Sequence, residues 1–276
     1  MSRILVTGAS GQLGSALVRR LVAENYPVRV ILRQHAFHPF LPMEKIERVD
    51  GSFYDPDLLE EALAGITTVF HVAGVVSYSA RRHSEVYRVN VNGTIRIFEA
   101  AVRAGVSEFI LTSSTMAVGV SPNSPPVGEE VSFPPNLYHI PYADSKRLSE
   151  RYVLAGAHRA QRVVALCPST IIGAGERLGN FRRLFQLAHR GLLLAAPPGM
   201  TGVVDVEDAV EGHLLAWRKG VSGKRYILNA ENISFRSLFG TINRAARRRI
   251  RPVVVPRGVV SGLYASLNFA AGVGFP

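Results

Sequence analysis

Strand-like and helix-like segments alternate from the start of the chain as far as Cys167. Short apolar runs such as ILVTG (4–8), VRVIL (28–32) and RVVALC (162–167) alternate with longer stretches whose apolar residues recur at helical spacing. The short runs are apolar on both faces, as in a parallel sheet that helices cover on each side. The alternation therefore predicts an α/β fold built on a doubly wound parallel sheet.

The same pattern gives the approximate bounds of the elements. Further strands are expected at 46–50, 68–74 and 108–114, and helices at 11–24, 58–65, 84–104 and 141–158. After residue 168, Pro, Gly and Arg become frequent, with helices expected near 178–190, 207–217 and 234–248 and strands near 203–205 and 225–229. We therefore expect a sheet domain of residues 1–170, to which 201–230 returns, and a small interleaved lobe of 171–200 and 231–276.

The first strand-to-helix turn is rich in glycine. The sequence VTGASGQLG places Gly8, Gly11 and Gly14 between an expected strand and an expected helix. In this context Gly8 permits a tight turn, Gly11 lets the backbone approach a pyrophosphate, and Gly14 lets the helix pack closely. The free N–H groups at the helix start favour the phosphate's negative charge. The turn predicts that the sheet domain is a Rossmann-type domain that binds a dinucleotide, which leaves the small lobe for the substrate.

The end of the second strand indicates which dinucleotide binds. An acid there favours NAD, whereas an arginine suits the extra phosphate of NADP. The strand VRVIL is followed by Arg33, and no acid occurs between Val28 and Pro39. We therefore expect NADP, with NAD as the alternative.

A tyrosine and a lysine lie four residues apart in HIPYADSKRLSE (139–150). The chain has only four lysines, and Tyr142 and Lys146 fall one helical turn apart, on one face of an expected helix. Hydride transfer to or from a nicotinamide needs a matching proton at the substrate oxygen. A nearby ammonium and an oxidised nicotinamide both favour the phenolate, so we expect them to lower the pKa of Tyr142. Ser114, at the end of a parallel strand, is placed to stabilise a developing oxyanion, with Ser113 and Thr115 as alternatives.

Five motifs together resemble those of the extended short-chain dehydrogenase/reductases. They are TGASGQLG (7–14), HVAG (71–74), VNVNGT (89–94), LTSS (111–114) and YADSK (142–146), which occur in the order and at the spacings usual in that family. FYDPDLLEEALAGITTVFHVAG and GKRYILNAENISFRSLF look like its dihydroflavonol-reductase-like branch. Several bacterial members of that branch are labelled sugar epimerases.

The resemblance implies roles for particular residues. Tyr142 would donate or accept the proton, with Lys146 as its partner and a ligand of the cofactor's ribose. Ser114 would hydrogen-bond the substrate oxygen, and Asn90 would support the proton relay. The position where the family often carries an acid near the adenine is Ser52. The complete predicted cofactor site comprises Gly8, Ser10, Gly11, Gln12, Leu13, Gly14, Arg33, Ser52, Phe53, Val72, Ala73, Gly74, Tyr142, Lys146, Pro168, Thr170 and Ile171; Tyr78, Met116 and His139 are expected near the substrate.

Composition and charge limit the kinds of partner and metal site that this chain can have. The formal net charge is +11, but the arginines are scattered and no nucleic-acid-binding motif surrounds the one tight cluster, RRRIR (247–251), so no nucleic-acid partner is expected. The single cysteine, Cys167, excludes an internal disulfide and a multi-cysteine metal site, and no metal is expected. Without a signal peptide or a membrane span in sight, we expect a cytoplasmic protein with no membrane partner. Apolar residues on the two long helices (Ile95, Phe98, Val102, Tyr152 and Val153) favour a homodimer.

Three functions fit these observations. We expect an NADP-dependent oxidoreductase that reduces a ketone or aldehyde of a small molecule at a Ser-Tyr-Lys site. The alternative is a nucleotide-sugar epimerase or dehydratase with a retained dinucleotide. A protein that senses a dinucleotide without catalysis is a further alternative, although this chain keeps both Tyr142 and Lys146. Loop and lobe residues follow no transferable code for the substrate.

Overall fold

The structure is a computed structural model that describes residues 2–33, 38–119, 126–131, 140–158, 162–173, 182–256 and 258–259. The chain forms two compact units, one of Met1–Leu178 with Val204–Asn229 and one of Gly179–Val203 with Ala230–Pro276. The assignment of a dinucleotide to the first unit and of a substrate to the second stays a prediction.

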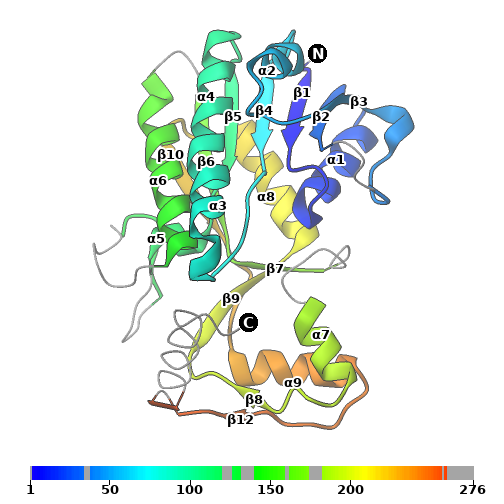
Figure 1. Cartoon of the computed structure of the whole chain (residues 1–276), viewed down its shortest axis with the longest axis vertical. Helices are drawn as coiled ribbons and strands as arrows, with labels where there is room; N and C mark the ends of the chain where they lie inside the picture. Colours follow the sequence, from blue (N-terminus) through cyan, green and yellow to red (C-terminus); the bar gives the residue numbers. More distant parts are fainter. Residues whose placement is uncertain are drawn as a thin grey trace. The chain divides into compact units, whose positions relative to one another are not determined.

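A seven-stranded sheet forms the first unit, and it runs in the order β10-β6-β5-β4-β1-β2-β3 (Figure 1). Each pair of neighbouring strands is parallel. The strands are β1 (Ile4–Thr7), β2 (Val28–Leu32), β3 (Glu47–Asp50), β4 (Thr68–His71), β5 (Glu108–Thr112), β6 (Arg162–Pro168) and β10 (Lys224–Leu228). The order runs outward in both directions from β1 and β4, so the predicted doubly wound sheet is confirmed, and its carboxyl edge at the reversal point is where such folds bind ligands.

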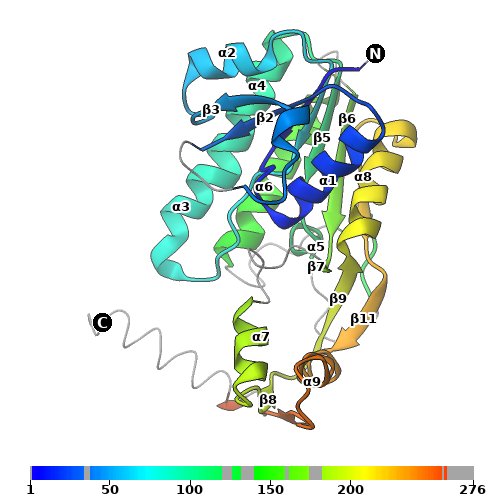
Figure 2. The same cartoon turned by 90° about the vertical axis from the view of Figure 1, so that its right-hand side faces the viewer.

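Helices cover both faces of this sheet (Figure 2). On one face, α1 (Gln12–Ala23) and α8 (Val206–Lys219) enclose an apolar layer that includes Leu17, Leu21 and Leu214. On the other face, α2 (Pro56–Leu63), α4 (Thr94–Arg103) and α6 (Pro141–Ala155) enclose a second layer that includes Phe98 and Phe109. Shorter elements are η1 (Met43–Lys45), η2 (Ala80–Arg82), α5 (Thr115–Val118), η4 (Gly156–His158) and β7 (Thr170–Ile172). Two separate apolar layers explain why the strands are apolar on both faces.

The burial of the helix residues bears on the expected dimer. Phe98 and Val153 are fully buried inside the unit, so they are core residues rather than part of an exposed face. Tyr152 is exposed, and its hydroxyl donates to Glu99 on α4 at 2.7 Å. Fewer residues than expected therefore support a homodimer, which stays a prediction.

The single helix expected over 84–104 is interrupted. It consists of α3 (His83–Tyr87), a π-helical segment η3 (Arg88–Gly93) and α4. A π-turn contains one more residue than an α-turn and so changes the direction of the side chains that follow it, often at functional sites. The segment includes Asn90, which is buried. The apolar periodicity of the sequence gave no sign of this interruption.

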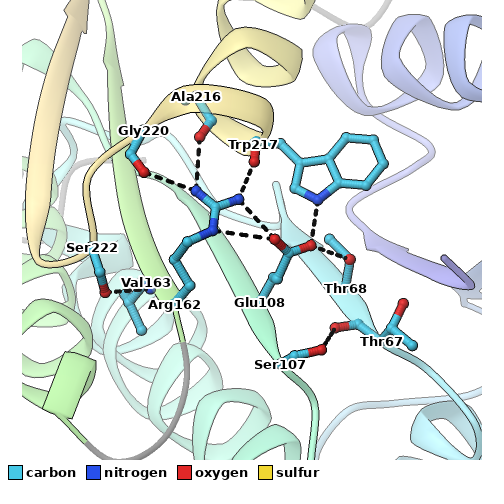
Figure 3. Close-up of polar contacts among 10 residues, drawn as sticks. All are labelled: Thr67, Thr68, Ser107, Glu108, Arg162, Val163, Ala216, Trp217, Gly220 and Ser222. Atoms are coloured by element: carbon cyan, nitrogen blue, oxygen red, sulfur yellow. Dashed lines mark hydrogen bonds and ion pairs between the residues drawn. The ribbon is translucent and has the colours of Figure 1, made fainter.

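A polar cluster ties the amino ends of three strands to the end of α8 (Figure 3). The Glu108 carboxylate on β5 accepts from Arg162 Nη2 at 2.8 Å, from Thr68 Oγ1 at 2.8 Å and from Trp217 Nε1 at 2.5 Å. The Arg162 guanidinium also donates to the carbonyl oxygens of Ala216, Trp217 and Gly220, where α8 ends. This cluster provides a side-chain donor to the carbonyls at the end of α8, where intrahelical donors run out. It lies at the edge of the sheet opposite the predicted site.

The second unit contains two helices and two small strand pairs in its described part. The helices are α7 (Arg182–His189) and α9 (Phe235–Ala245). The strand β11 (Glu231–Ser234) pairs antiparallel with β9 (Met200–Asp205), and β12 (Val253–Val254) pairs parallel with β8 (Ala195–Ala196). The buried Asn243 side chain on α9 donates to the carbonyl oxygens of Leu193 and Ile250, which joins the helix to the chain on both sides.

Candidate active site

The glycine-rich turn adopts a compact conformation between β1 and α1. Gly8 has a backbone φ of +71°, which residues other than glycine rarely adopt. Its carbonyl oxygen accepts a hydrogen bond from Gly11 N at 3.0 Å. A Cβ on Gly8 would lie 2.6 Å from Ala73 N, and a Cβ on Gly14 would lie 2.2 Å from the Gly8 oxygen. Both glycines are therefore required by the turn itself.

Gly11 is different because it is less crowded than Gly8 and Gly14. It precedes the first residue of α1, and the nearest atom to a Cβ at this position is the Gly8 oxygen at 3.3 Å. The helix start leaves backbone N–H groups without partners inside the helix. Phosphate binding at these N–H groups stays a prediction. Of the neighbouring predicted residues, Ser10 is half-buried, Gln12 donates to the Gly173 carbonyl at 3.2 Å, and Leu13 is buried in the core.

The segment after β4 lies between this turn and α6. Ala73 N donates to Thr7 Oγ1 at 3.3 Å, which holds the segment against the end of β1. Val72 is half-buried, and a Cβ on Gly74 would lie 3.1 Å from Lys146 Nζ. The predicted cofactor residues of β1, β4 and α6 therefore meet at the carboxyl edge of the sheet.

Tyr142 and Lys146 are both buried on α6, at 7% and 6% exposure. The Lys146 amine donates to the Thr112 carbonyl at the end of β5 at 2.8 Å. Burial lowers the pKa of Lys146 to about 8, although Cys167 and Glu150 act in the opposite direction. The lysine is thus anchored at the sheet edge rather than extended into solvent.

Burial raises the pKa of Tyr142 to about 12, although a hydrogen bond from Ser114 lowers it. Contrary to the expected lowering, the pKa of Tyr142 is thus raised in the protein without a dinucleotide, where the Lys146 amine is directed to the Thr112 carbonyl. The phenol is protonated at neutral pH. The expected effect of a positive nicotinamide on this group stays a prediction.

Ser114 and Ser113 point to different partners. Ser114 hydrogen-bonds Tyr142, and its Oγ also accepts from Met116 N at 3.2 Å at the start of α5. The Ser113 hydroxyl donates to the Glu150 carboxylate instead. Of the serines considered, Ser114 is thus the one beside Tyr142.

Asn90 joins three parts of the site. Its amide Nδ2 donates to the Val75 carbonyl at 2.9 Å and to Ser145 Oγ at 3.0 Å, while its Oδ1 accepts from Val75 N at 2.8 Å. Ser145 Oγ in turn donates to the Tyr142 carbonyl at 2.7 Å. The side chain thus fixes the segment after β4 against the helix turn that carries Tyr142.

The remaining predicted residues are less closely engaged. Arg33 is exposed directly after β2, and Ser52 is exposed with its Oγ accepting from Tyr54 N. Phe53 packs against the position of Gly93, where a Cβ would lie 2.5 Å from its ring. Tyr78 is exposed, with its ring centroid 5.9 Å from that of Tyr142. Met116 is half-buried on α5, Pro168 ends β6, and Thr170 and Ile171 form β7, whereas His139 lies outside the described residues.

Sequence reasoning missed several polar residues of the site. Ser169 is buried just after β6, and its Oγ has no hydrogen-bond partner in the described part of the chain. The Thr112 carbonyl and Ser145 hold α6 in place through contacts with Lys146 and Asn90 that only the folded chain creates. Glu150 was detectable, since Lys146-x-x-x-Glu150 repeats the four-residue spacing of Tyr142 and Lys146. No group of three or more possible metal ligands occurs among the described residues, and none of their helices is long and apolar enough to cross a bilayer.

The parallel sheet with its glycine-rich first turn defines a Rossmann-type α/β protein. The chain belongs to the NAD-dependent epimerase/dehydratase family, whose model matches residues 4–229. The resemblance to the extended short-chain dehydrogenase/reductases is thereby confirmed, and with it the expectation of an enzyme of the NAD(P)-dependent reductase, epimerase and dehydratase type.

Individual relatives share much of the chain. A putative dihydroflavonol 4-reductase from Synechocystis is 32% identical, covering 96% of this chain and 77% of the relative. Sterol demethylase protein B from Methylococcus capsulatus is 31% identical, covering 94% of this chain and 79% of the relative. The crystal structure of a double mutant of dTDP-glucose 4,6-dehydratase from Streptomyces venezuelae, with NAD bound, superposes with a TM-score of 0.80 at 25% identity, covering 93% of this chain and 85% of that one.

Proposed function

We propose that this chain is an NADP-dependent reductase of a ketone or aldehyde in a small molecule. The first unit would bind the dinucleotide, and the second would contribute to substrate binding. The observation that carries this proposal is the position of Tyr142, a buried phenol that is hydrogen-bonded to Ser114 and is protonated at neutral pH. Carbonyl reduction needs a neutral proton donor at the carbonyl oxygen, and a buried phenol supplies one at neutral pH.

Each residue of the site has a defined role in this proposal. When bound, the reduced nicotinamide supplies the hydride. Tyr142 donates a proton to the carbonyl oxygen, and the Ser114 hydroxyl hydrogen-bonds that same oxygen as its negative charge develops. The Lys146 amine, anchored on Thr112, binds the ribose and favours the phenolate left after proton donation. Asn90 keeps the start of α6 in place through Ser145.

The first turn and the end of β2 would hold the dinucleotide. The N–H groups at the start of α1 would bind the pyrophosphate, with Gly11 allowing its approach. Arg33 would pair with the ribose phosphate that distinguishes NADP from NAD, since no acid occupies this strand end. The name of the Synechocystis relative, a putative dihydroflavonol 4-reductase, also favours reduction.

A nucleotide-sugar epimerase or dehydratase is the second candidate. The Streptomyces dehydratase with bound NAD favours it, because that enzyme shares the fold and acts on a sugar nucleotide. Such reactions begin with oxidation and so need the phenolate as a base, which the burial of Tyr142 disfavours as long as no oxidised nicotinamide is bound. A non-catalytic dinucleotide sensor is the weakest candidate, since such a protein does not need the buried Tyr142 and Lys146 pair.

Tyr142→Phe tests the catalytic assignment. The substitution deletes the hydroxyl and keeps the ring, so packing and dinucleotide affinity should change little, while turnover should fall about 10²–10⁴-fold. Turnover is measured with NADPH against a panel of ketones, aldehydes and nucleotide sugars, and affinity by NADPH fluorescence. Tyr152→Phe, which removes an exposed hydroxyl from the same helix, is the matched control. Near-normal turnover in Tyr142→Phe would exclude the proposed role.

Arg33→Ala tests the choice of dinucleotide. Loss of a charge-assisted phosphate contact should weaken NADP binding about 10- to 150-fold, corresponding to about 1.5–3 kcal/mol, and leave NAD binding nearly unchanged. Arg103→Ala, at an exposed arginine at the end of α4, is the control for a general loss of positive charge. Equal affinities of the wild type for both dinucleotides, measured by titration calorimetry, would refute the preference.

A further inference from the structure

A buried carboxylate lies one helical turn beyond Lys146. Glu150 is 2% exposed, and it receives hydrogen bonds from three different elements of the sheet. The Ser113 hydroxyl after β5 donates to its Oε2, Cys167 Sγ on β6 lies 3.3 Å from the same oxygen, and Arg225 Nη1 on β10 donates to Oε1 at 3.0 Å. An acid that is almost fully buried and has three donors is not a solvated helix residue.

Arg225 gives this carboxylate its counter-charge. A buried charge is costly unless it is paired and its remaining lone pairs are satisfied. The guanidinium pairs with Glu150 and also donates to the carbonyl oxygens of Glu129 at 2.8 Å and Val131 at 2.6 Å. Glu129 makes a second contact with β10, because its Oε1 accepts a hydrogen bond from Ile227 N at 2.9 Å. The described segment 126–131, β10 and α6 are thus joined at one ion pair.

Three consecutive residues at the end of β5, Thr112 to Ser114, meet three successive turns of α6. The Thr112 carbonyl accepts from Lys146, Ser113 donates to Glu150, and Ser114 hydrogen-bonds Tyr142. Tyr142, Lys146 and Glu150 are spaced four residues apart and so share one face of the helix. Glu150 supplies the one contact of the three that does not involve a proposed catalytic group.

We propose that Glu150 is a positioning residue: paired with Arg225, it holds the 112–114 segment on the face of α6 that carries Tyr142 and Lys146, and its charge acts on the lysine. This inference rests on the proposed function for the roles of Tyr142 and Lys146. It goes beyond that proposal, because Glu150 and Arg225 contact neither the expected substrate oxygen nor the expected dinucleotide. A volume-conserving neutral substitution should therefore alter the lysine without removing a catalytic group.

The surroundings of Lys146 make Glu150 the charged group that matters. The titratable groups near the amine are His71 on β4, Cys167 on β6, and Tyr142 and Glu150 on α6. Burial lowers the pKa of His71 to about 3, and burial followed by the Glu150 charge raises the pKa of Cys167, so both are neutral at pH 7. Tyr142 is likewise neutral. Among these described groups, Glu150 alone carries a negative charge that favours the ammonium form of Lys146.

Glu150→Gln tests the proposal by a direct titration of the lysine. The chain has four lysines, Lys45, Lys146, Lys219 and Lys224, so ¹³C-labelled lysine gives an NMR spectrum simple enough to assign with Lys146→Met. Removal of a charge one helical turn away should lower the titration midpoint of Lys146 by about one pH unit or more. A midpoint lowered from about 8 to about 7 leaves about half of the Lys146 amines unprotonated at pH 7. Turnover at pH 7 should therefore fall about 2-fold or more and recover in part at lower pH, where the lysine is again protonated.

Matched variants separate this effect from a general loss of stability. Glu108→Gln removes a hydrogen-bonded carboxylate at the opposite end of β5 and should leave the Lys146 midpoint unchanged. Glu150→Asp keeps the charge and should restore the midpoint toward the wild-type value. If Glu150→Gln fails to fold because Arg225 is left unpaired, the double variant Glu150→Gln/Arg225→Gln removes both charges. Loss of the Arg225 cation offsets part of the loss of the Glu150 anion, so the Lys146 midpoint should fall in the same direction but by less.

Two outcomes overturn the proposal. One is a Lys146 midpoint that is the same in the wild type and in Glu150→Gln, or in the double variant if that is the form that folds. The other is a Glu150→Gln variant whose Lys146 midpoint is shifted but whose turnover is no lower than that of Glu108→Gln. The failure of the proposed function has a different signature, namely near-normal turnover in Tyr142→Phe, and the NMR titration does not depend on any substrate.

Discussion

Replacing each of the three glycines of the first turn by alanine should change stability and dinucleotide affinity in different ways. A Cβ at position 14 would lie 2.2 Å from the Gly8 oxygen, whereas one at position 11 would lie 3.3 Å from that atom and meet nothing else within 4 Å. Ordinary contacts begin at about 3.5 Å, so Gly14→Ala must displace the backbone by about 1 Å, and Gly11→Ala by only a few tenths of an ångström. Gly11 also has φ −81° and ψ 170°, which alanine adopts freely.

These distances translate into different free energies of unfolding. We expect Gly14→Ala to cost about 3 kcal/mol or more, the upper range for overpacking, and to lower Tm by about 10 °C. Gly11→Ala should cost about 1 kcal/mol or less, or about 3 °C, because only a helix N-cap preference is lost. The same Cβ occupies the space that the pyrophosphate is expected to approach, so dinucleotide affinity should fall about 10-fold or more.

Gly8→Ala combines a clash with an unfavourable backbone conformation. Gly105 isolates the second effect, because it has φ +70° and nothing within 4 Å of its would-be Cβ. Gly105→Ala should cost about 1–2 kcal/mol from the left-handed conformation alone, and the additional loss in Gly8→Ala measures the clash with Ala73.

Thermal unfolding followed by circular dichroism gives the stabilities of the four variants, and NADPH fluorescence gives their affinities. The reasoning predicts that stability and affinity separate at Gly11 and fall together at Gly14. It is refuted if Gly11→Ala is destabilised as strongly as Gly14→Ala, or if Gly11→Ala binds the dinucleotide as the wild type does.

Two further predictions concern the Glu108–Arg162 cluster at the amino edge of the sheet (Figure 3). Arg162→Met should lower the free energy of unfolding by about 2–4 kcal/mol in urea titrations, because it removes the counter-charge of the partly buried Glu108 and one donor to the carbonyls at the end of α8. A loss below about 1 kcal/mol would contradict this role. Burial tends to raise the pKa of Glu108, but hydrogen bonds from Trp217, Arg162 and Thr68 lower it overall. Because the pKa is lower in the folded state, the stability difference between wild type and Glu108→Gln should be full at pH 7 and shrink below about pH 4.5; a difference independent of pH would exclude the ionised form as its source.

The sequence by itself determined the fold class and the order of the elements. Apolar runs such as VRVIL (28–32) became buried parallel strands, because only strands covered on both faces tolerate uninterrupted apolar residues. The first turn was likewise predictable, since glycines at fixed spacing leave few backbone conformations, and Gly8 indeed has a positive φ. The spacing of Tyr142 and Lys146 determined that they share a helix face.

Only the tertiary structure decided how that pair is held and charged. The direction of the Lys146 amine depends on the Thr112 carbonyl, which is 34 residues away, and the pKa of Tyr142 depends on burial by several elements. The π-helical segment that positions Asn90, and the donors that meet Glu150 from β5, β6 and β10, likewise follow from packing between distant parts of the chain. Local periodicity indicates which face of an element is buried. The protonation state of a side chain depends instead on its neighbours in three dimensions, and no short stretch of sequence specifies these neighbours.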